Sequence, residues 1–117
     1  AINQAGLLDE KFFMYGEDLD FCKRVADRKW KSVYVSDARI IHFGGGSSKR
    51  RKIKSLINFY EAMWIYYKKH FFKQNNLFFS FVVWSGIKIK MYIALLANSI
   101  KNSTASIFKS LYSLILL

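Results

Sequence analysis

The second half of the chain constrains the fold most, because it combines apolar and aromatic residues at helical spacing with an excess of lysine. Residues 53–117 hold eight basic residues and one acidic residue, a net charge of +7. Residues 53–72 have helical periodicity, with a broad aromatic arc on one side of the predicted helix and a narrow polar stripe on the other. The stripe consists of Lys54, Asn58, Glu61 and Lys68. The pattern predicts amphipathic helices with one face on an apolar partner.

Residues 77–100 form a second apolar stretch. Its longest uncharged run, Leu77 to Ile87, is shorter than the roughly 20 residues that span a bilayer. Lys88 and Lys90 interrupt the stretch, and each would cost about 2.5–3.5 kcal/mol at the centre of a spanning helix. The final segment, Ser103 to Leu117, repeats the mixture of apolar residues with a lysine. We therefore predict helices that lie on an anionic membrane surface.

The charge is spread unevenly along the chain. Residues 1–30 have a net charge of −1, whereas residues 31–52 have a net charge of +5. An acidic start and a basic remainder indicate an anionic partner: a membrane surface, a nucleic acid or a phosphorylated ligand. Aromatic residues alternate with lysines in residues 66–73 and could stack bases, or they could form a solvated helix end. Membrane docking explains both the charge and the apolar surface, so we expect no nucleic-acid partner.

The first half of the chain shows a helix followed by two short β-prone runs. Residues 17–29 have helical periodicity, and the runs are Ser32–Val35 and Ala38–His42, separated by the turn-prone pair Ser36-Asp37. A glycine- and serine-rich loop, residues 44–48, follows. The single cysteine, Cys22, excludes an intrachain disulfide and fits a reducing compartment.

Asp18 is the first candidate site residue. On a helical wheel it falls in the middle of the apolar arc of residues 17–29, whereas Asp20 and Asp27 point the opposite way. A carboxylate on a buried face must be hydrogen-bonded, paired or used in chemistry. Helix evidence alone favours an N-cap or first-turn acid. The alternative is a general base aimed into a cleft, with Glu17 beside it as a ligand for a sugar hydroxyl.

His42 is the second candidate. It ends an apolar run and precedes the loop of residues 44–48. A lone histidine at the end of a strand is more often structural than catalytic. As a ligand, it could meet a metal ion and the phosphates that the ion carries. The loop itself lacks the lysine and the spacing of a P-loop.

Residues 6–48, "GLLDEKFFMYGEDLDFCKRVADRKWKSVYVSDARIIHFGGGSS", resemble the C-terminal part of the catalytic domain of family 2 glycosyltransferases. The nearest match is with rhamnosyltransferase-like members that build bacterial surface polysaccharides. Their pattern, G-G-F-D-E-x-F-F-x-Y-x-E-D-x-D-L-x-x-R, matches Gly6 to Arg24 here. The later family positions then fall on Trp30, Tyr34, Ala38 and His42.

The resemblance implies an α/β fold for residues 1–50, the acceptor-side part of a GT-A-type domain, followed by mostly α, amphipathic helices in residues 51–117. It implies inverting transfer from a nucleotide-sugar to a saccharide or lipid-linked acceptor at the cytoplasmic face of the bacterial membrane. Asp18 would be the base and Glu17 would bind the acceptor. His42 would be a ligand of the divalent ion, Mg or Mn, that holds the nucleotide diphosphate.

The resemblance also implies roles for residues around the candidate base, and the chain departs from the family pattern at three positions. Tyr15 and Trp30, with Phe13, would shape the acceptor cleft or pack beneath it, and Gly44, Gly45 and Ser47 would form a phosphate-side loop. Lys29, Ser36 and Leu8 stand where relatives often have glycine, proline and phenylalanine.

The metal- and donor-binding Asp-x-Asp motif of the family is missing here. The one D-x-D in the chain, Asp18-Leu19-Asp20, is split by the helical period onto opposite faces. We therefore expect the chain to be the C-terminal portion of a longer enzyme that is inactive alone. The alternative is a non-catalytic module that binds a membrane surface.

Overall fold

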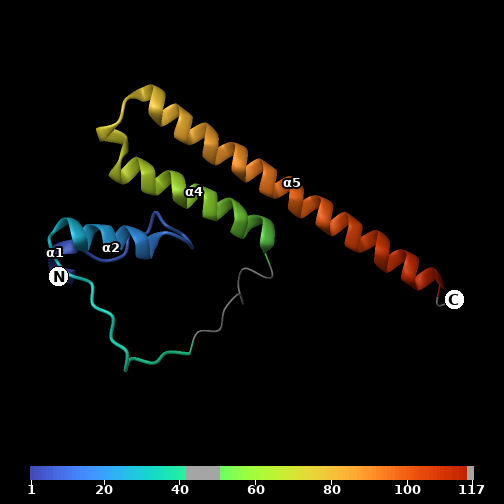
Figure 1. The fold of residues 1–117 in the computed structure, drawn as a ribbon, viewed down its shortest axis with the longest axis horizontal. Helices are drawn as coiled ribbons and strands as arrows, with labels where there is room; N and C mark the ends of the chain where they lie inside the picture. Colours follow the sequence, from blue (N-terminus) through green and yellow to red (C-terminus); the bar gives the residue numbers. More distant parts are fainter. Residues whose placement is uncertain (42–50, 116–117) are drawn as a thin grey trace.

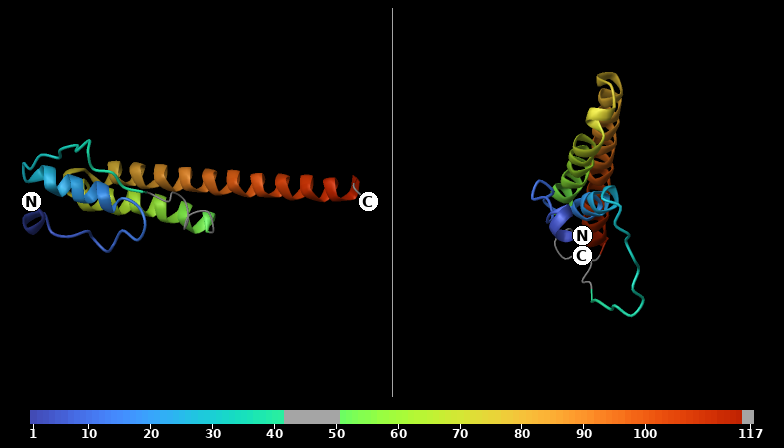
Figure 2. Two further views of the ribbon diagram at one scale, coloured as in Figure 1. Left: turned by 90° about the horizontal axis from the view of Figure 1, so that it is seen from below. Right: turned by 90° about the vertical axis from the view of Figure 1, so that its left-hand side faces the viewer.

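The fold is built on an antiparallel pair of helices (Figure 1). The computed structural model describes residues 1–41 and 51–115. The elements are α1 (Ile2–Ala5), α2 (Glu17–Asp27), α4 (Lys52–His70), the 3₁₀ turn η1 (Phe72–Gln74) and α5 (Leu77–Ile115). Helix α5 runs back along α4 and continues well past the N-terminal end of α4, as the side view in Figure 2 shows.

The turn between α4 and α5 is fixed by two asparagines. The Asn75 side chain donates a hydrogen bond to the carbonyl oxygen of Phe71 at 2.8 Å. Asn76 caps α5, because its Oδ1 accepts the N–H of Phe79 at 2.8 Å. At a rise of 1.5 Å per residue, the 39 residues of α5 span about 58 Å and the 19 residues of α4 about 28 Å. More than a third of α5 therefore extends beyond α4.

Helix α5 meets α4 along a seam with coiled-coil spacing. Ser80, Ile87 and Met91 are buried on this side of α5. The hydroxyls of Tyr67 on α4 and Ser80 on α5 lie 3.0 Å apart and share a buried hydrogen bond. Side chains from both helices line a cavity of about 330 Å³ that is mostly apolar but includes two charged residues; they are Tyr60, Glu61, Trp64, Ile65, Trp84, Ile87, Lys88 and Met91. Burial of this seam holds the two helices together.

The opposite side of α5 is an exposed apolar stripe that no described residue covers. We call it the outer stripe; its members are all 48% exposed or more, and they are Phe78, Val82, Ile89, Ile93, Leu96, Ile100 and Ile107. Helix α5 is long and apolar enough, by length and composition, to cross a membrane between Leu77 and Ile107. It is also one continuous helix over Leu77–Ile115, so this part of the chain does not turn back on itself.

A tight turn at Gly16 places the start of α2 against α4. Gly16 has φ 85°, a left-handed conformation that favours glycine. A Cβ at this position would lie 3.2 Å from the ring of Phe12 and 3.6 Å from the Cβ of Ala62 on α4. Phe12 and Ala62 are both buried. The left-handed φ is therefore the main reason for glycine, and a Cβ would in addition press on the Phe12 ring while making only an ordinary contact with Ala62.

The structure contradicts the predicted α/β fold, because residues 1–41 and 51–115 contain no strand. The β-prone run Ser32–Val35 and residues 38–41 are irregular and exposed, although the turn predicted at Ser36-Asp37 is present. A strand needs a hydrogen-bonded neighbour, and no described segment pairs with this one. The helices predicted for residues 17–29, 53–72 and 77–100 are confirmed, the last as part of the longer α5.

We expect Ile87→Ala to lower the free energy of unfolding by about 2–4 kcal/mol, because truncating a buried isoleucine leaves a cavity in the α4–α5 seam. Ile93→Ala is the matched control, since Ile93 lies on the same helix and is 60% exposed. Its effect should stay within about 0.5 kcal/mol. Urea unfolding followed by circular dichroism, without lipid, measures both values. Equal losses would contradict the seam.

Candidate functional site

The candidate site begins at the first turn of α2, directly after Gly16. Glu17, Asp18 and Asp20 all lie in this turn, where the helix dipole favours negative charge. Asp18 is exposed, and its Oδ1 accepts the backbone N–H of Leu19 at 2.8 Å. The geometry matches the first-turn acid interpretation in one respect, because a free backbone N–H is satisfied. No described residue covers the rest of the Asp18 carboxylate, which faces solvent.

The prediction that Asp18 points into the protein and Asp20 into solvent is wrong. Asp20 is fully buried, at 0% exposure, and Asp18 is exposed. On the apolar arc of α2, Leu19 is 61% exposed and Cys22 is also exposed. The packed side of α2 is mixed, because Val25 is buried as well as Asp20. Asp20 can be buried because Arg24 and Lys69 pair with its charge, and paired charges can be buried where single ones cannot.

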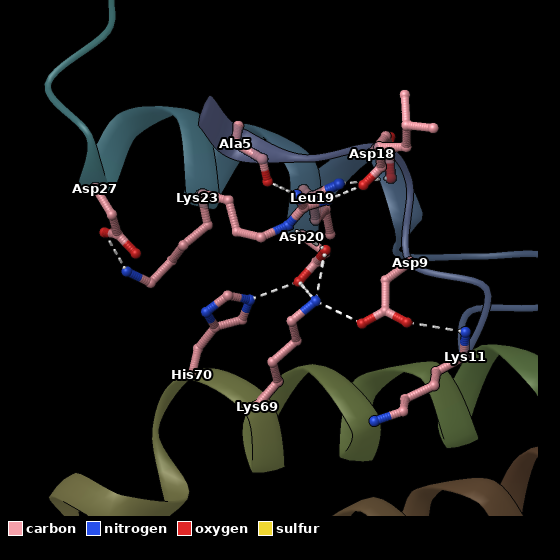
Figure 3. A network of polar contacts seen from close by, with 12 residues as sticks. Ala5, Asp9, Lys11, Asp18, Leu19, Asp20, Lys23, Asp27, Lys69 and His70 are labelled. Carbon is pink, nitrogen blue, oxygen red and sulfur yellow. Dashed lines mark hydrogen bonds and ion pairs between the residues drawn. The ribbon is translucent and has the colours of Figure 1, made fainter. Parts of the chain in front are cut away.

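Asp20 lies at the centre of a cluster of ionic contacts (Figure 3). Its Oδ1 lies 2.8 Å from Lys69 Nζ and 2.8 Å from His70 Nε2, and its Oδ2 accepts a hydrogen bond from Arg24 Nε at 2.8 Å. Lys69 also contacts Asp9 at 2.5 Å. We call these five residues, Asp9, Asp20, Arg24, Lys69 and His70, the Asp20 cluster. It joins α2, α4 and the loop that precedes α2.

Arg24 extends the Asp20 cluster to the start of the chain. Its guanidinium donates hydrogen bonds to the carbonyl oxygens of Ala5 and Leu7, the latter at 2.7 Å. Ala5 ends α1 and is buried. One arginine therefore connects α1, the segment after it and α2. This is the use for which the planar, multidentate guanidinium is suited.

The ion pairs shift the pKa values of the cluster. Burial alone would raise the pKa of Asp20, but hydrogen bonds from Lys69, His70 and Arg24 outweigh it and lower that pKa below 3.8. The hydrogen bond from Lys69 lowers the pKa of Asp9. Burial opposes the charge on Lys69, yet hydrogen bonds to Asp20 and Asp9 raise the pKa of its ammonium above 10.5. Asp9, Asp20 and Lys69 therefore stay ionised across the neutral range.

Tyr15 and Glu17, on either side of Gly16, are both partly covered. Oε2 of Glu17 is covered and has no hydrogen-bond partner among the described residues, and the same holds for Nδ2 of Asn58 on α4. The Tyr15 hydroxyl lies 2.5 Å from the Ser55 hydroxyl. Tyr15 also lines a groove between α4 and α5, together with Lys52, Ser55, Leu56, Phe59, Ala94 and Asn98. Tyr15 therefore contacts α4, and one carboxylate oxygen of Glu17 is covered.

Trp30 lies at the far end of α2 and is not brought to Asp18. Its indole Nε1–H donates a hydrogen bond to Oε1 of Gln4 at 2.8 Å, and its side chain is 46% exposed. The preceding Lys29 has φ 64°, a left-handed conformation that favours glycine. This explains why a glycine is common at this position in the family that the sequence resembles.

His42, Gly44, Gly45 and Ser47 lie outside the described residues, so their predicted roles stay predictions. In residues 1–41 and 51–115, no group of three or more histidine, cysteine, aspartate or glutamate side chains is placed to hold a metal ion.

Sequence reasoning missed the Asp20 cluster. Asp20 and Arg24 stand at i and i+4, the spacing of a helical ion pair, and this signal was present. The partners Lys69 and His70 follow Asp20 by 49 and 50 residues, so no local pattern joins them to it.

Comparison with known proteins gives one partial relationship. The chain is 35% identical over 66 residues to N-acetylglucosaminyl-diphospho-decaprenol L-rhamnosyltransferase of Mycobacterium tuberculosis, in strains CDC 1551 / Oshkosh and ATCC 25618 / H37Rv. The match covers 56% of this chain and 22% of the relative. No protein-family model and no solved structure matches the chain. The relationship supports a glycosyltransferase-like chain and goes no further.

We expect the stability of the folded chain to fall in acid because of Asp20. Its folded pKa lies below 3.8, so its contribution is fully present above the unfolded value and is lost as the pH falls through the folded pKa. Unfolding free energies measured from about pH 6 to about pH 2 should fall less steeply in Asp20→Asn than in wild type. Parallel curves for the two proteins would show that Asp20 does not carry this dependence.

Proposed function

We propose that this chain is the acceptor-side part of an inverting glycosyltransferase that moves a sugar, such as rhamnose, from a nucleotide-sugar to a saccharide or lipid-linked acceptor. The observation that carries the proposal is the 66-residue similarity to a rhamnosyltransferase. The exposed position of Asp18 at the start of α2 is compatible with it, because a base must reach its substrate.

Asp18 is the proposed base. Its Oδ1 is oriented by the N–H of Leu19, and the carboxylate is exposed to a substrate that approaches α2 from the side away from α4. The carboxylate accepts the proton of the acceptor hydroxyl, and the hydroxyl oxygen forms a bond to the anomeric carbon of the donor. The bond from that carbon to the nucleotide diphosphate breaks, and the configuration inverts. Glu17, the residue before the base in the sequence, is the proposed ligand of the acceptor, and this role rests on the sequence resemblance alone.

A divalent ion, Mg or Mn, is part of the proposal. When bound, such an ion supplies positive charge that stabilises the leaving diphosphate. His42 is the proposed ligand from this chain, with Gly44, Gly45 and Ser47 as the loop on the phosphate side. All four lie outside the described residues, so this part rests on the sequence resemblance alone.

The outer stripe of α5 is the proposed membrane-docking surface. On the helix, Lys88 lies on one side of the stripe, and Lys90 and Lys101 lie on the other. Lysines in these positions can reach lipid phosphates while the stripe enters the apolar layer. This supports a peripheral position on the cytoplasmic face of the membrane, where lipid-linked acceptors are found.

Asp18→Asn in the complete protein should reduce sugar transfer by at least about 100-fold, because an amide cannot accept the proton. The matched control is Asp27→Asn, an exposed aspartate of the same helix that pairs with Lys23. It should change the rate less than twofold. The assay follows radiolabelled sugar from the nucleotide donor into a lipid-linked acceptor, with divalent metal present. Equal rates for wild type and Asp18→Asn would remove the base assignment.

Leu96→Asp should weaken binding to anionic vesicles at least tenfold, because it places a charge in the outer stripe, where Leu96 is 64% exposed. Ala97→Asp adds the same charge one position along, outside the stripe, and should weaken binding less than about threefold. Sedimentation with phosphatidylglycerol vesicles at low and high salt measures both.

Two other results of these experiments would change the proposal. Resistance of the bound protein to alkaline carbonate extraction would show that α5 crosses the membrane. Vesicle binding by a complete protein without any transfer activity would favour the alternative, a non-catalytic membrane-binding module.

A further inference from the structure

Asp20 is the most completely buried side chain among the described residues, although it carries a charge. Its three partners, Arg24, Lys69 and His70, lie 2.8 Å to 3.0 Å from its oxygens, so the carboxylate is fully engaged. Nothing in the proposed transfer reaction uses it as an acid, a base or a ligand. Its burial therefore calls for another explanation.

The partners of Asp20 show what it connects. Arg24 belongs to α2 itself, whereas Lys69 and His70 form the last turn of α4. Lys69 also holds Asp9, in the loop before α2, and thereby bridges two carboxylates. In Figure 3 the side chains of Lys69 and His70 rise from α4 and meet Asp20 from below, while Asp18 projects on the far side of α2.

The side chains of Asp18 and Asp20 have fixed directions relative to each other, because both lie on α2. They are two positions apart, and at 100° per residue the helix turns about 200° between them. Holding Asp20 against α4 therefore turns Asp18 to the opposite side of α2, toward open solvent. A rotation of α2 on α4 would move Asp18 by the same angle.

We propose that Asp20 is a positioning residue that fixes the rotation of α2 on α4 and so sets the direction of Asp18. Because α4 is packed against α5, the same contact links the outer stripe to the helix that carries Asp18. The proposal rests on the proposed function, in that Asp18 must be the base for its direction to matter in transfer. The contact between α2 and α4 does not depend on that function.

The test compares Asp20→Asn and Lys69→Met with Asp27→Asn in the complete protein on membranes. Asp27 is the matched control, because it lies on the same helix and its ion pair with Lys23, at 2.7 Å, stays within α2. Asp20→Asn should lower kcat at least tenfold and change the KM for the nucleotide-sugar less than twofold. Lys69→Met, which leaves Arg24 and His70 on the carboxylate, should have a smaller effect in the same direction. Asp27→Asn should change neither constant more than twofold.

The double variant separates positioning from general damage. Asp20 and Lys69 act through one contact, so the loss in Asp20→Asn/Lys69→Met should be smaller than the product of the two single losses. A loss equal to that product would overturn the proposal. So would a kcat for Asp20→Asn equal to that of Asp27→Asn.

Amide hydrogen exchange in the same proteins gives a second measurement that does not depend on transfer. Asp20→Asn should raise exchange in residues 17–27 and leave residues 80–95 of α5 unchanged. Faster exchange in α2 with an unchanged kcat would overturn positioning and leave a purely stabilising contact. If Asp18→Asn retains full activity, the proposed function fails, and the exchange of α2 still decides whether Asp20 holds that helix on α4.

Discussion

The buried carboxylate of Asp20 decides which side of α2 faces the rest of the chain. Its desolvation is offset by hydrogen bonds from three side chains, and two of these, Lys69 and His70, belong to α4. Once that pairing forms, α2 buries Asp20 together with Val25 and leaves Leu19 and Cys22, from its apolar arc, exposed. An amphipathic helix normally buries its whole apolar arc and no single acid at its packed face. The ionic contact therefore accounts for the orientation of Asp18, which lies on the side that α4 does not cover.

Helix α4 connects the two functional regions. Its buried residues face two neighbours: Ala62 lies beside Gly16 at the start of α2, and Tyr67 bonds to Ser80 on α5. Its last turn carries Lys69 and His70, which suit the negative end of the helix dipole as well as the Asp20 carboxylate. The turn through Asn75 and Asn76 then starts α5 directly after these residues. The ionic and apolar contacts of the fold thus meet at one end of one helix.

The parts of the fold that could be predicted are those set by nearby residues. Helical periodicity located α2, α4 and α5, because the pattern acts over one or two turns. The β-prone run after α2 did not form strands, because a strand depends on a partner that local sequence cannot supply. The burial of Asp20 could not be predicted for the same reason. A helical wheel of residues 17–29 includes Arg24 but not Lys69 or His70, which are distant in the sequence. The hydrophobic pattern alone predicted that Asp18 is buried and Asp20 exposed, whereas ion pairing buries Asp20 and leaves Asp18 exposed.

Three surfaces of the described chain remain uncovered, and their chemistry differs. The apolar side of α2 carries Asp18, residues 31–41 are exposed and β-prone, and the outer stripe of α5 is apolar with lysines beside it. The first two lie close in sequence and place exposed β-prone residues near an exposed acid. The third has the composition of a lipid contact. On the proposed function, the donor-binding half covers the first two and the membrane covers the third. Helix α4 lies between these surfaces, so the Asp20 contact would hold the base at a fixed place relative to the membrane.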